Sequence, residues 1–585
     1  MVNENWEPKT KGILDILPEE IVDFEEQVAR FQAGDWNPND FMAFRLRQGI
    51  YGQRQPDSQM IRVKAPYGGI TAEQMDTLGE FAEKYTPLKK GHVTTRENFQ
   101  FHHVPLADTP AIMRLIGDVG LSTREACGNT VRNVTGCPMA GVCENEPFDV
   151  TPYAAAYARY FVRHPFTQSL PRKFKTSFSD CEADCAISGI HDMGFIPKIV
   201  DGEKGFEMIT GGGTSIMPRI GQTLFDFVPM EEYLKVTEAV IRIFHQTDEL
   251  RKNRMKARIK FYIDRIGIEE FRSQVEHELK KDWANKSFDP TALLFIEDES
   301  QLAPDLDGNY RAGSEPAFED WCESNVRAQR QSGYNVASIK LPLGDVKSDQ
   351  FHSIANISRK YSGGRMRLTH QQNIALRWVP DRALYEVWMK LEELGLGDSG
   401  VHEISDVVSC PGTDSCKLGI TSSMGLGNSI SKMISEMDTS DQHIKNMHIK
   451  MSGCPNGCGQ HHVADIGFHG AAAKGPGGQI PAYEVFVGGS FDNGDTRIGQ
   501  RVKTKVPAKK VPEALGKILN HYKDFRENDE QFKDFVVRMG PESFEPLLSE
   551  YKEIPDLNRE SLDMYMDWTK TVKYQVERGE GECAV

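Results

Sequence analysis

The sequence contains no apolar run that approaches the roughly 18 residues of a membrane span, and its first residues, MVNENWEPKTKG, include no apolar stretch typical of secretion. We therefore expect a cytoplasmic protein with no membrane partner. Nucleotide-binding loops are missing as well. The run Gly211-Gly212-Gly213 is not followed by the glycine spacing of a dinucleotide or phosphate loop, so the chain should not bind its own nicotinamide donor.

Positive charge is also scarce. The chain has 69 Lys and Arg against 85 Asp and Glu, a net charge of −16, which disfavours nucleic acid as a partner. Any anionic ligand must therefore be met by a local group of cations. With 585 residues, 39% of them apolar, and glycine and proline scattered along the chain, the sequence predicts a packed protein of several domains.

The chain is internally duplicated. Gln53-Arg54-Gln55 recurs as Gln329-Arg330-Gln331, and TTRENFQFHHVP at 94–105 recurs as THQQNIALRWVP at 369–380. Matches in the same order, at a nearly constant offset, continue through most of two halves. The repeat predicts a molecule with pseudo-two-fold symmetry, whose ligand site lies where the halves face each other.

Cysteine spacing carries the strongest chemical signal. Cys410 and Cys416 stand in SCPGTDSCKLG, and Cys454 and Cys458 stand in SGCPNGCGQHH. Four thiolates suit an iron–sulfur cluster or zinc. Structural zinc sites usually have shorter C-x2-4-C spacings, so the C-x5-C and C-x3-C pattern favours a [4Fe-4S] cluster, with zinc as the alternative.

This pattern, in the second half of a duplicated chain, resembles the siroheme-containing sulfite and nitrite reductases. The likeness extends over nearly the whole chain beyond the N-terminal arm. It implies that the four cysteines hold [4Fe-4S] and that Cys458 also bridges to the siroheme iron. It further implies an α+β (α/β) fold, in which ferredoxin-like half-domains of the two halves pair into one domain and two α/β domains remain.

The predicted boundaries follow the repeat. We expect an N-terminal arm at 1–50, half-domains at 51–120 and 326–396, a linker at 282–325, and α/β domains at 121–281 and 397–585, the last carrying the cluster cysteines.

The resemblance also assigns a group of polar side chains to the ligands. Substrate would be held by four first-half cations, Arg62, Arg132, Lys173 and Lys175. The carboxylates of siroheme would be held by Arg96, Gln100, Arg172 and His92. The second half has Ser338, Ser405, Asn446 and His448 at the positions equivalent to the four substrate cations, so the repeat predicts a single catalytic pocket.

The cysteines do not share this asymmetry. Cys137, Cys143, Cys181 and Cys185 repeat the second-half spacing, and one constant offset relates all four to their counterparts. Our hypothesis is a second [4Fe-4S] cluster that acts as an electron relay or a structural staple, and the alternative is a relic with inert thiols. A second siroheme is disfavoured because Gln371 stands at the position equivalent to Arg96.

Three further cysteines lie outside these sets. Tyr51 and Cys127 occupy positions that form a side-chain crosslink in some relatives of the family, whereas Cys322 and Cys583 have no partner pattern.

The resemblance implies six-electron reduction of sulfite to sulfide, with electrons from a separate donor such as ferredoxin or a flavoprotein. Sulfite is favoured because Lys173-Phe-Lys175 matches the Lys-x-Lys of sulfite reductases, whereas nitrite reductases tend to have Lys-x-Asn. Sulfite also carries the larger negative charge. The alternatives are nitrite reduction to ammonia and, more remotely, a non-catalytic iron–sulfur electron-transfer subunit.

Overall fold

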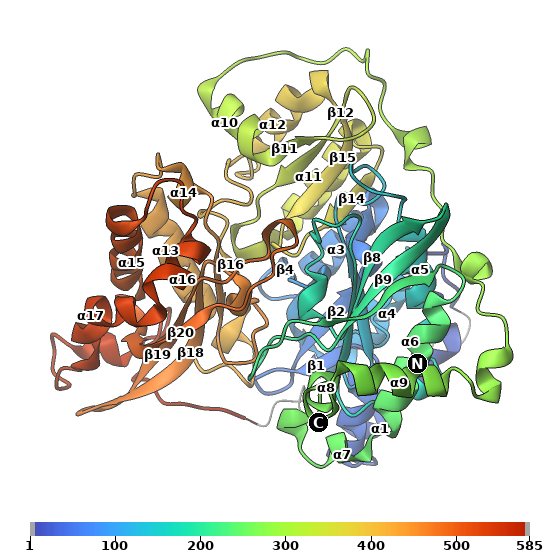
Figure 1. The fold of residues 1–585 in the computed structure, drawn as a ribbon, viewed down its shortest axis with the longest axis horizontal. Coiled ribbons are helices and arrows are strands. Elements are labelled where there is room, and N and C mark those ends of the chain that lie inside the picture. The colour runs from blue at the N-terminus through green and yellow to red at the C-terminus, as the bar shows by residue number, and fades with distance from the viewer. Residues whose placement is uncertain (1–5, 580–585) are drawn as a thin grey trace.

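The computed structural model describes residues 6–579, which form four five-stranded sheets (Figure 1). Each half of the chain supplies one sheet of a central domain and one sheet of an outer α/β domain. The elements recur in the same order in both halves. This arrangement confirms the predicted duplicated α+β (α/β) fold.

The central domain is built by exchange of strands between the halves. Its first sheet has the order β1 (Ile50–Gly52), β2 (Ser58–Lys64), β5 (Asn98–Pro105), β4 (Lys90–Val93), β13 (Asp345–Lys347). Its second sheet has the order β11 (Val326–Ala328), β12 (Tyr334–Ile339), β15 (Ile374–Pro380), β14 (Arg365–Leu368), β3 (Gly69–Thr71). Each half therefore completes the sheet of the other half with one short edge strand.

Local sequence explains how the exchanged strands begin. A left-handed residue precedes each of them, Tyr67 with φ 46° before β3 and Leu343 with φ 52° before β13. Helix α3 (Ala72–Tyr85) then follows β3, and the Thr71 hydroxyl and the Gln74 side chain form a capping box at its first turn.

One hydrophobic core joins the two half-domains. Helix α3 packs against its counterpart α11 (Ser348–Tyr361), and α4 (Thr109–Asp118), α10 (Pro316–Asn325) and α12 (Leu384–Glu393) cover the same core. The N-terminal helices α1 (Pro18–Gln32) and α2 (Pro38–Arg47) add Phe24, Val28 and Phe41 to it. The half-domains therefore share one buried interior.

Each of the two outer domains contains its own five-stranded mixed sheet. The first has the order β10 (Gln222–Pro229), β9 (Glu203–Thr210), β8 (Met193–Val200), β7 (Phe174–Phe178), β6 (Val131–Gly136). Its helices are α5 (Thr151–Phe161), α6 (Tyr233–Gln246), α7 (Asp248–Arg251), α8 (Ile259–Ile266) and α9 (Ile268–Glu278). In this sheet β6, β7 and β8 are parallel, and β9 and β10 are antiparallel.

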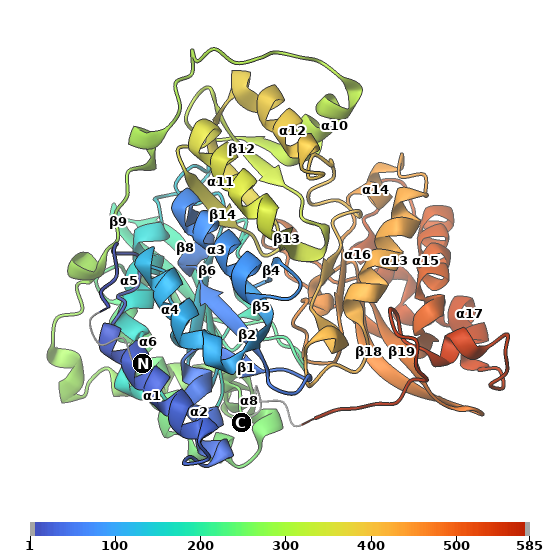
Figure 2. The ribbon, with the colours of Figure 1, turned by 180° about the vertical axis from the view of Figure 1, so that it is seen from behind.

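The second outer domain repeats the first. Its sheet runs β16 (Val408–Ser409), β17 (Ile449–Ser452), β18 (Ile466–Gly475), β19 (Gly478–Val487), β20 (Gln500–Pro507). Its helices are α13 (Ser423–Ser435), α14 (Gln442–Lys445), α15 (Val511–Phe525), α16 (Phe532–Met539) and α17 (Glu545–Leu548). Seen from either side, this orange and red domain stands beside the blue and teal first half (Figures 1 and 2).

The segment between α9 and α10 runs along the outside of the molecule (Figure 1) and contains only short 3-10 turns. One of its side chains, Glu299, is nevertheless buried. Within residues 6–579, no helix has both the length and the apolar character needed to cross a membrane.

Candidate active site

A cavity lies between the first half and the second outer domain. Arg62, His92, Arg96, Gln100, Arg132, Lys173 and Lys175 line it from the first half. The four cysteines 410, 416, 454 and 458 line it from the second half. The structure thus brings together most of the predicted site residues across the interface of the two halves. Arg172 does not line this cavity, and its role as a siroheme ligand stays a prediction.

The sheet of the second outer domain explains why the cysteines converge. Cys410 directly follows β16 and Cys454 lies just after β17, and these two strands are parallel. Carboxyl ends of neighbouring parallel strands meet at one edge of a sheet. The loops that continue from these ends carry Cys416 and Cys458 to the same edge.

The cysteine loops are tightly folded. A Cβ at Gly453 would lie 2.6 Å from the Cα of Gly412, which itself has φ +55°, so both positions require glycine. The Gly453 amide donates to the Cys410 sulfur at 3.2 Å, and the Ser423 hydroxyl lies 3.5 Å from it. Such hydrogen bonds stabilise negative charge on a cluster-ligating sulfur.

Burial and neighbouring thiols raise the pKa of Cys410 and of Cys454. A set of thiolates in this place therefore requires positive charge from a metal centre. Cysteines, glycine turns and sulfur-directed donors together fit a [4Fe-4S] cluster.

The repeated QRQ motif explains how the halves are joined at the site. Arg54 donates from its amide to Ser415 at 3.0 Å and from its guanidinium to Gly419 at 2.8 Å, and Gln55 donates to Asp414 at 2.8 Å. The first half-domain thereby holds the loop that carries Cys416. The second copy does the same for the first-half loop, since Arg330 donates to Val142 and forms an ion pair with Glu146.

Arg62 and Arg132 share a hydrogen-bond acceptor. Both donate to the carbonyl of Ala126, at 2.9 and 3.1 Å, and Arg132 also donates to Gly128. With its amide oxygen turned toward Arg62, Gln100 accepts from that guanidinium at 2.7 Å. These contacts fix two positively charged side chains at the wall of the cavity.

Lys175 and Arg96 are buried, and burial is the main cause of their lowered pKa values. The pKa of Lys175 falls well below 10.5, with Arg96 and Lys173 adding repulsion, and the pKa of Arg96 falls to about 10. The Nε of Arg96 has no hydrogen-bond partner among the described residues. An anion bound here would stabilise the charged form of both side chains.

The charge of the cavity is one-sided. Arg62, Arg96, Arg132, Lys173 and Lys175 line it, and of the residues the structure describes no aspartate or glutamate does so. In a chain of net charge −16, such a concentration indicates a polyanionic ligand. Siroheme, whose ring carries many carboxylates, fits this lining beside the cysteines.

Sequence reasoning missed His102. Its ring lines the cavity with neither nitrogen hydrogen-bonded in the described structure, and burial lowers its pKa to about 3. The signal was available in β5. Side chains alternate along a strand, so Gln100 and His102 lie on one face. Gln53, Thr95 and Asn456 also line the cavity and were not predicted.

His92 is held from the other half. Its Nδ1 lies 3.0 Å from Asp345 on the exchanged strand β13, and its Nε2 lies 3.0 Å from the Gln372 amide. The second half therefore orients a first-half side chain in the cavity.

The remaining cysteines take up different surroundings. The first-half set lies at the equivalent edge of the other outer sheet, with Cys137 directly after β6 and Cys181 after β7. Tyr51 and Cys127 pack in one buried cluster, and their crosslink stays a prediction. Cys583 lies outside the described residues.

Comparison with known proteins agrees with this site. The family model for the nitrite and sulphite reductase 4Fe-4S domain matches residues 127–283 and 400–556. The model for the nitrite/sulfite reductase ferredoxin-like half domain matches residues 51–119 and 327–394.

Individual relatives cover most of the chain. A ferredoxin sulfite reductase of Mycolicibacterium paratuberculosis is 29% identical over 82% of each chain. A ferredoxin–nitrite reductase of Synechococcus elongatus is 27% identical over 84% of this chain and 93% of its own length. The solved structure of the Mycobacterium tuberculosis NirA protein has the same fold, with a TM-score of 0.75 over 92% of this chain and 98% of its own, at 24% identity. Since the 4Fe-4S domain alone matches more than half of the residues, the chain belongs to the nitrite and sulfite reductase family.

Proposed function

We propose that the protein catalyses the six-electron reduction of sulfite to sulfide in this cavity. The observation that carries the proposal is the group of five lining cations, with no acid among the described lining residues, beside four convergent cysteines. Siroheme, when bound, supplies an iron that ligates the substrate, next to a cluster that supplies electrons. A cytoplasmic setting is part of the proposal, because these thiols must stay reduced.

The side chains of the cavity bind the anion and supply protons. Arg62 and Arg132, anchored on Ala126, offer guanidinium donors to the oxygens of a small oxyanion. Lys175 suits proton delivery because burial lowers its pKa, so that its ammonium group releases a proton more readily than an exposed lysine. Protons are needed because each oxygen of the substrate leaves as water.

Substrate preference is tested best by kinetics with both anions. We expect a higher kcat/KM for sulfite than for nitrite, measured with the same reduced donor. Lys175→Asn removes one cation, so it should reduce kcat/KM for the dianion more than for the monoanion. An equal loss for both anions would contradict the charge argument for sulfite.

Nitrite reduction to ammonia is the second candidate. The same cations can bind nitrite, and relatives of similar identity are named for each of the two reactions. A kcat/KM for nitrite above that for sulfite in the unaltered enzyme would establish nitrite as the preferred substrate.

The electron donor is proposed to be ferredoxin, which the names of both relatives include. A separate flavoprotein is the alternative, and turnover with each reduced donor distinguishes them. A non-catalytic electron-transfer subunit would lack siroheme. Absorption of the purified protein tests that alternative, because siroheme has a Soret and a long-wavelength band that an iron–sulfur cluster alone does not have.

A further inference from the structure

The first-half cysteines form a compact group around a buried carboxylate. An oxygen of Asp180 lies within 4.8 Å of the sulfurs of Cys137 and Cys185, and an oxygen of the same side chain lies within 4.8 Å of those of Cys143 and Cys181. The thiols also form two pairs, since the sulfurs of Cys137 and Cys185 lie within 4.8 Å of each other, as do those of Cys143 and Cys181. The donor groups thus make two triads that share Asp180.

Asp180 is unusual for a buried acid. The residue is 0% exposed, neither carboxylate oxygen has a hydrogen-bond partner among the described residues, and the sulfurs of all four cysteines lie within 4.8 Å of one of its oxygens. A buried carboxylate without a strong donor or a cation is costly, by several kcal/mol for an isolated charge. Four neighbouring thiols supply no compensating charge. With no partner for this carboxylate among residues 6–579, the group of donors is suited to receive a cation.

The catalytic cysteines are arranged differently. Gly453 stands immediately before Cys454, as Asp180 stands immediately before Cys181, so the second set has no carboxylate in the equivalent position. Of the described residues, no three cysteines of either set have sulfurs within 4.8 Å of one another, and it is Asp180 that completes each first-half triad. The first-half set therefore differs in having a fifth donor, a carboxylate that both of its cysteine pairs share.

The number of donors decides between one metal and several. A tetrahedral ion takes four ligands, which leaves one of these five donors unused. Two triads, each of two sulfurs and a carboxylate oxygen, instead suit two metal atoms. Thiolate-rich sites favour iron–sulfur centres or zinc, and this chain carries an iron–sulfur domain in both halves.

We propose that Cys137, Cys143, Cys181, Cys185 and Asp180 bind a second iron–sulfur cluster, in which each cysteine pair ligates one side and Asp180 is an additional ligand. This cluster is smaller than a second [4Fe-4S] cubane, because its ligand sulfurs are paired around the carboxylate. The proposal is independent of the substrate of the enzyme and of the cation group in the catalytic cavity.

The test is metal analysis of holoprotein purified without oxygen. Iron and acid-labile sulfide should exceed the complement of one siroheme and one [4Fe-4S] cluster. Cys185→Ser, at an exposed position, and Cys181→Ser, at a buried one, should both remove the excess and leave siroheme absorption intact. Cys322→Ser, a cysteine outside both sets, is the matched control and should retain the full iron and sulfide content.

Unaltered protein with no excess iron would overturn the proposal, as would zinc at this site without excess sulfide. Electron paramagnetic resonance of the reduced protein should show a second cluster signal that Cys185→Ser removes. Asp180→Gly, which copies the second half, and Asp180→Asn should shift the g-values or the midpoint potential of that signal. An unchanged signal in both variants would exclude Asp180 as a ligand.

Discussion

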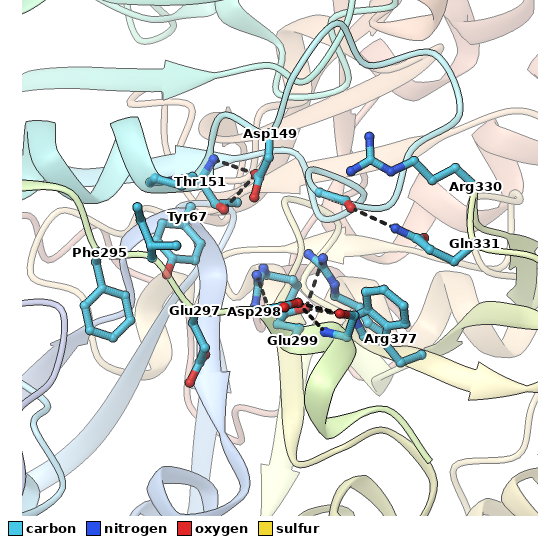
Figure 3. A pocket seen from close by; sticks show the side chains of 16 residues that line it. Tyr67, Asp149, Thr151, Phe295, Glu297, Asp298, Glu299, Arg330, Gln331 and Arg377 are labelled. Carbon is cyan, nitrogen blue, oxygen red and sulfur yellow. Dashed lines mark hydrogen bonds and ion pairs between the residues drawn. The ribbon is translucent and has the colours of Figure 1, made fainter. Parts of the chain in front are cut away.

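The two halves build two pockets at related positions, and the pockets differ in charge. The catalytic cavity contains five cations and, within the described chain, no acidic side chain. The second pocket combines three arginines with four acids, Asp149, Glu297, Asp298 and Glu299 (Figure 3). The lining of the first pocket therefore attracts a polyanion, whereas acids already neutralise the cations of the second.

Equivalent strand positions make the comparison direct. In the aligned repeats, Arg367 and Arg377 stand at the positions of His92 and His102, which line the catalytic cavity. Glu299 accepts from Arg367 at 2.6 Å and lies 3.0 Å from Arg377, and Trp378 donates to it at 3.1 Å. Burial would raise the pKa of Glu299, but the two arginines lower it to about 2.

Glu299 lies between α9 and α10, in the connection between the two halves. The second pocket is therefore neutralised by a segment outside the repeated sequence. The duplication therefore preserved the backbone around both pockets. Substituted side chains and the acids of the connecting segment leave only one of these two pockets with the excess positive charge that a polyanion requires.

Removal of a catalytic cysteine should have the largest effect. Cys458→Ala deletes a side chain that we expect to ligate the cluster and to bridge to the siroheme iron, so sulfite reduction should fall by more than about 1000-fold, together with loss of cluster iron. Steady-state rates and iron analysis measure it. Cys322→Ser is the control, and comparable loss in that variant would show general sensitivity to cysteine replacement.

Removal of an anchored cation should have the next largest effect. Arg132→Met keeps much of the length of the side chain but removes the donors, so kcat/KM should fall by about 100-fold to 1000-fold. Arg377→Met, in the second pocket, should leave kcat/KM within about twofold. If kcat/KM falls equally in both variants, the difference in charge between the two pockets does not identify the one that binds substrate.

Glu299→Gln tests the second pocket through stability. It leaves two buried arginines without a carboxylate, which should lower the free energy of unfolding by about 3–5 kcal/mol. Denaturant unfolding measures it, with Asp298→Asn, at an exposed neighbour, as the control. A change no larger than that of an ordinary surface substitution, about 0.5 kcal/mol, would show that Glu299 is not needed to neutralise the arginines.

The same group predicts a pH dependence. The pKa of Glu299 is about 2 in the fold, against an ordinary value of 4.5. Its stabilising contribution should be complete above about pH 4.5 and decline as the pH falls toward 2. In Glu299→Gln this part of the acid dependence should be absent, and an unchanged acid profile would contradict the lowered pKa.

Substitutions in the two QRQ motifs should give the smallest effects. Arg54→Ala removes contacts with the Cys416 loop, and we expect about 1–2 kcal/mol lower stability and reduced occupancy of the catalytic cluster. Arg330→Ala removes the equivalent contacts with the first-half loop and should leave the catalytic cluster fully occupied. Equal loss of the catalytic cluster from both variants would show that neither arginine acts specifically on the cysteine loop that it contacts.

Much of the site followed from sequence because cysteine spacing and a consistent repeat are one-dimensional signals. They indicated the convergent cysteines and the duplicated fold, and the resemblance to the siroheme reductases implied the five cations that line the cavity. His102 was missed because a histidine within a strand has no distinctive spacing. The contacts of Glu299 could not be predicted either, since they join a turn-rich connection to strands that are distant in the sequence.

The sequence by itself determined the two copies of the fold, the two cysteine sets and the loss of equivalent cations from the second half, because these are properties of residue identity at fixed spacing. Only the tertiary structure decided which pocket has an excess of positive charge, that half-domains exchange β3 and β13, and that Asp180 lies among four thiols. These features depend on contacts between distant segments. The free-energy cost of a buried charge depends on which groups surround it in the folded structure.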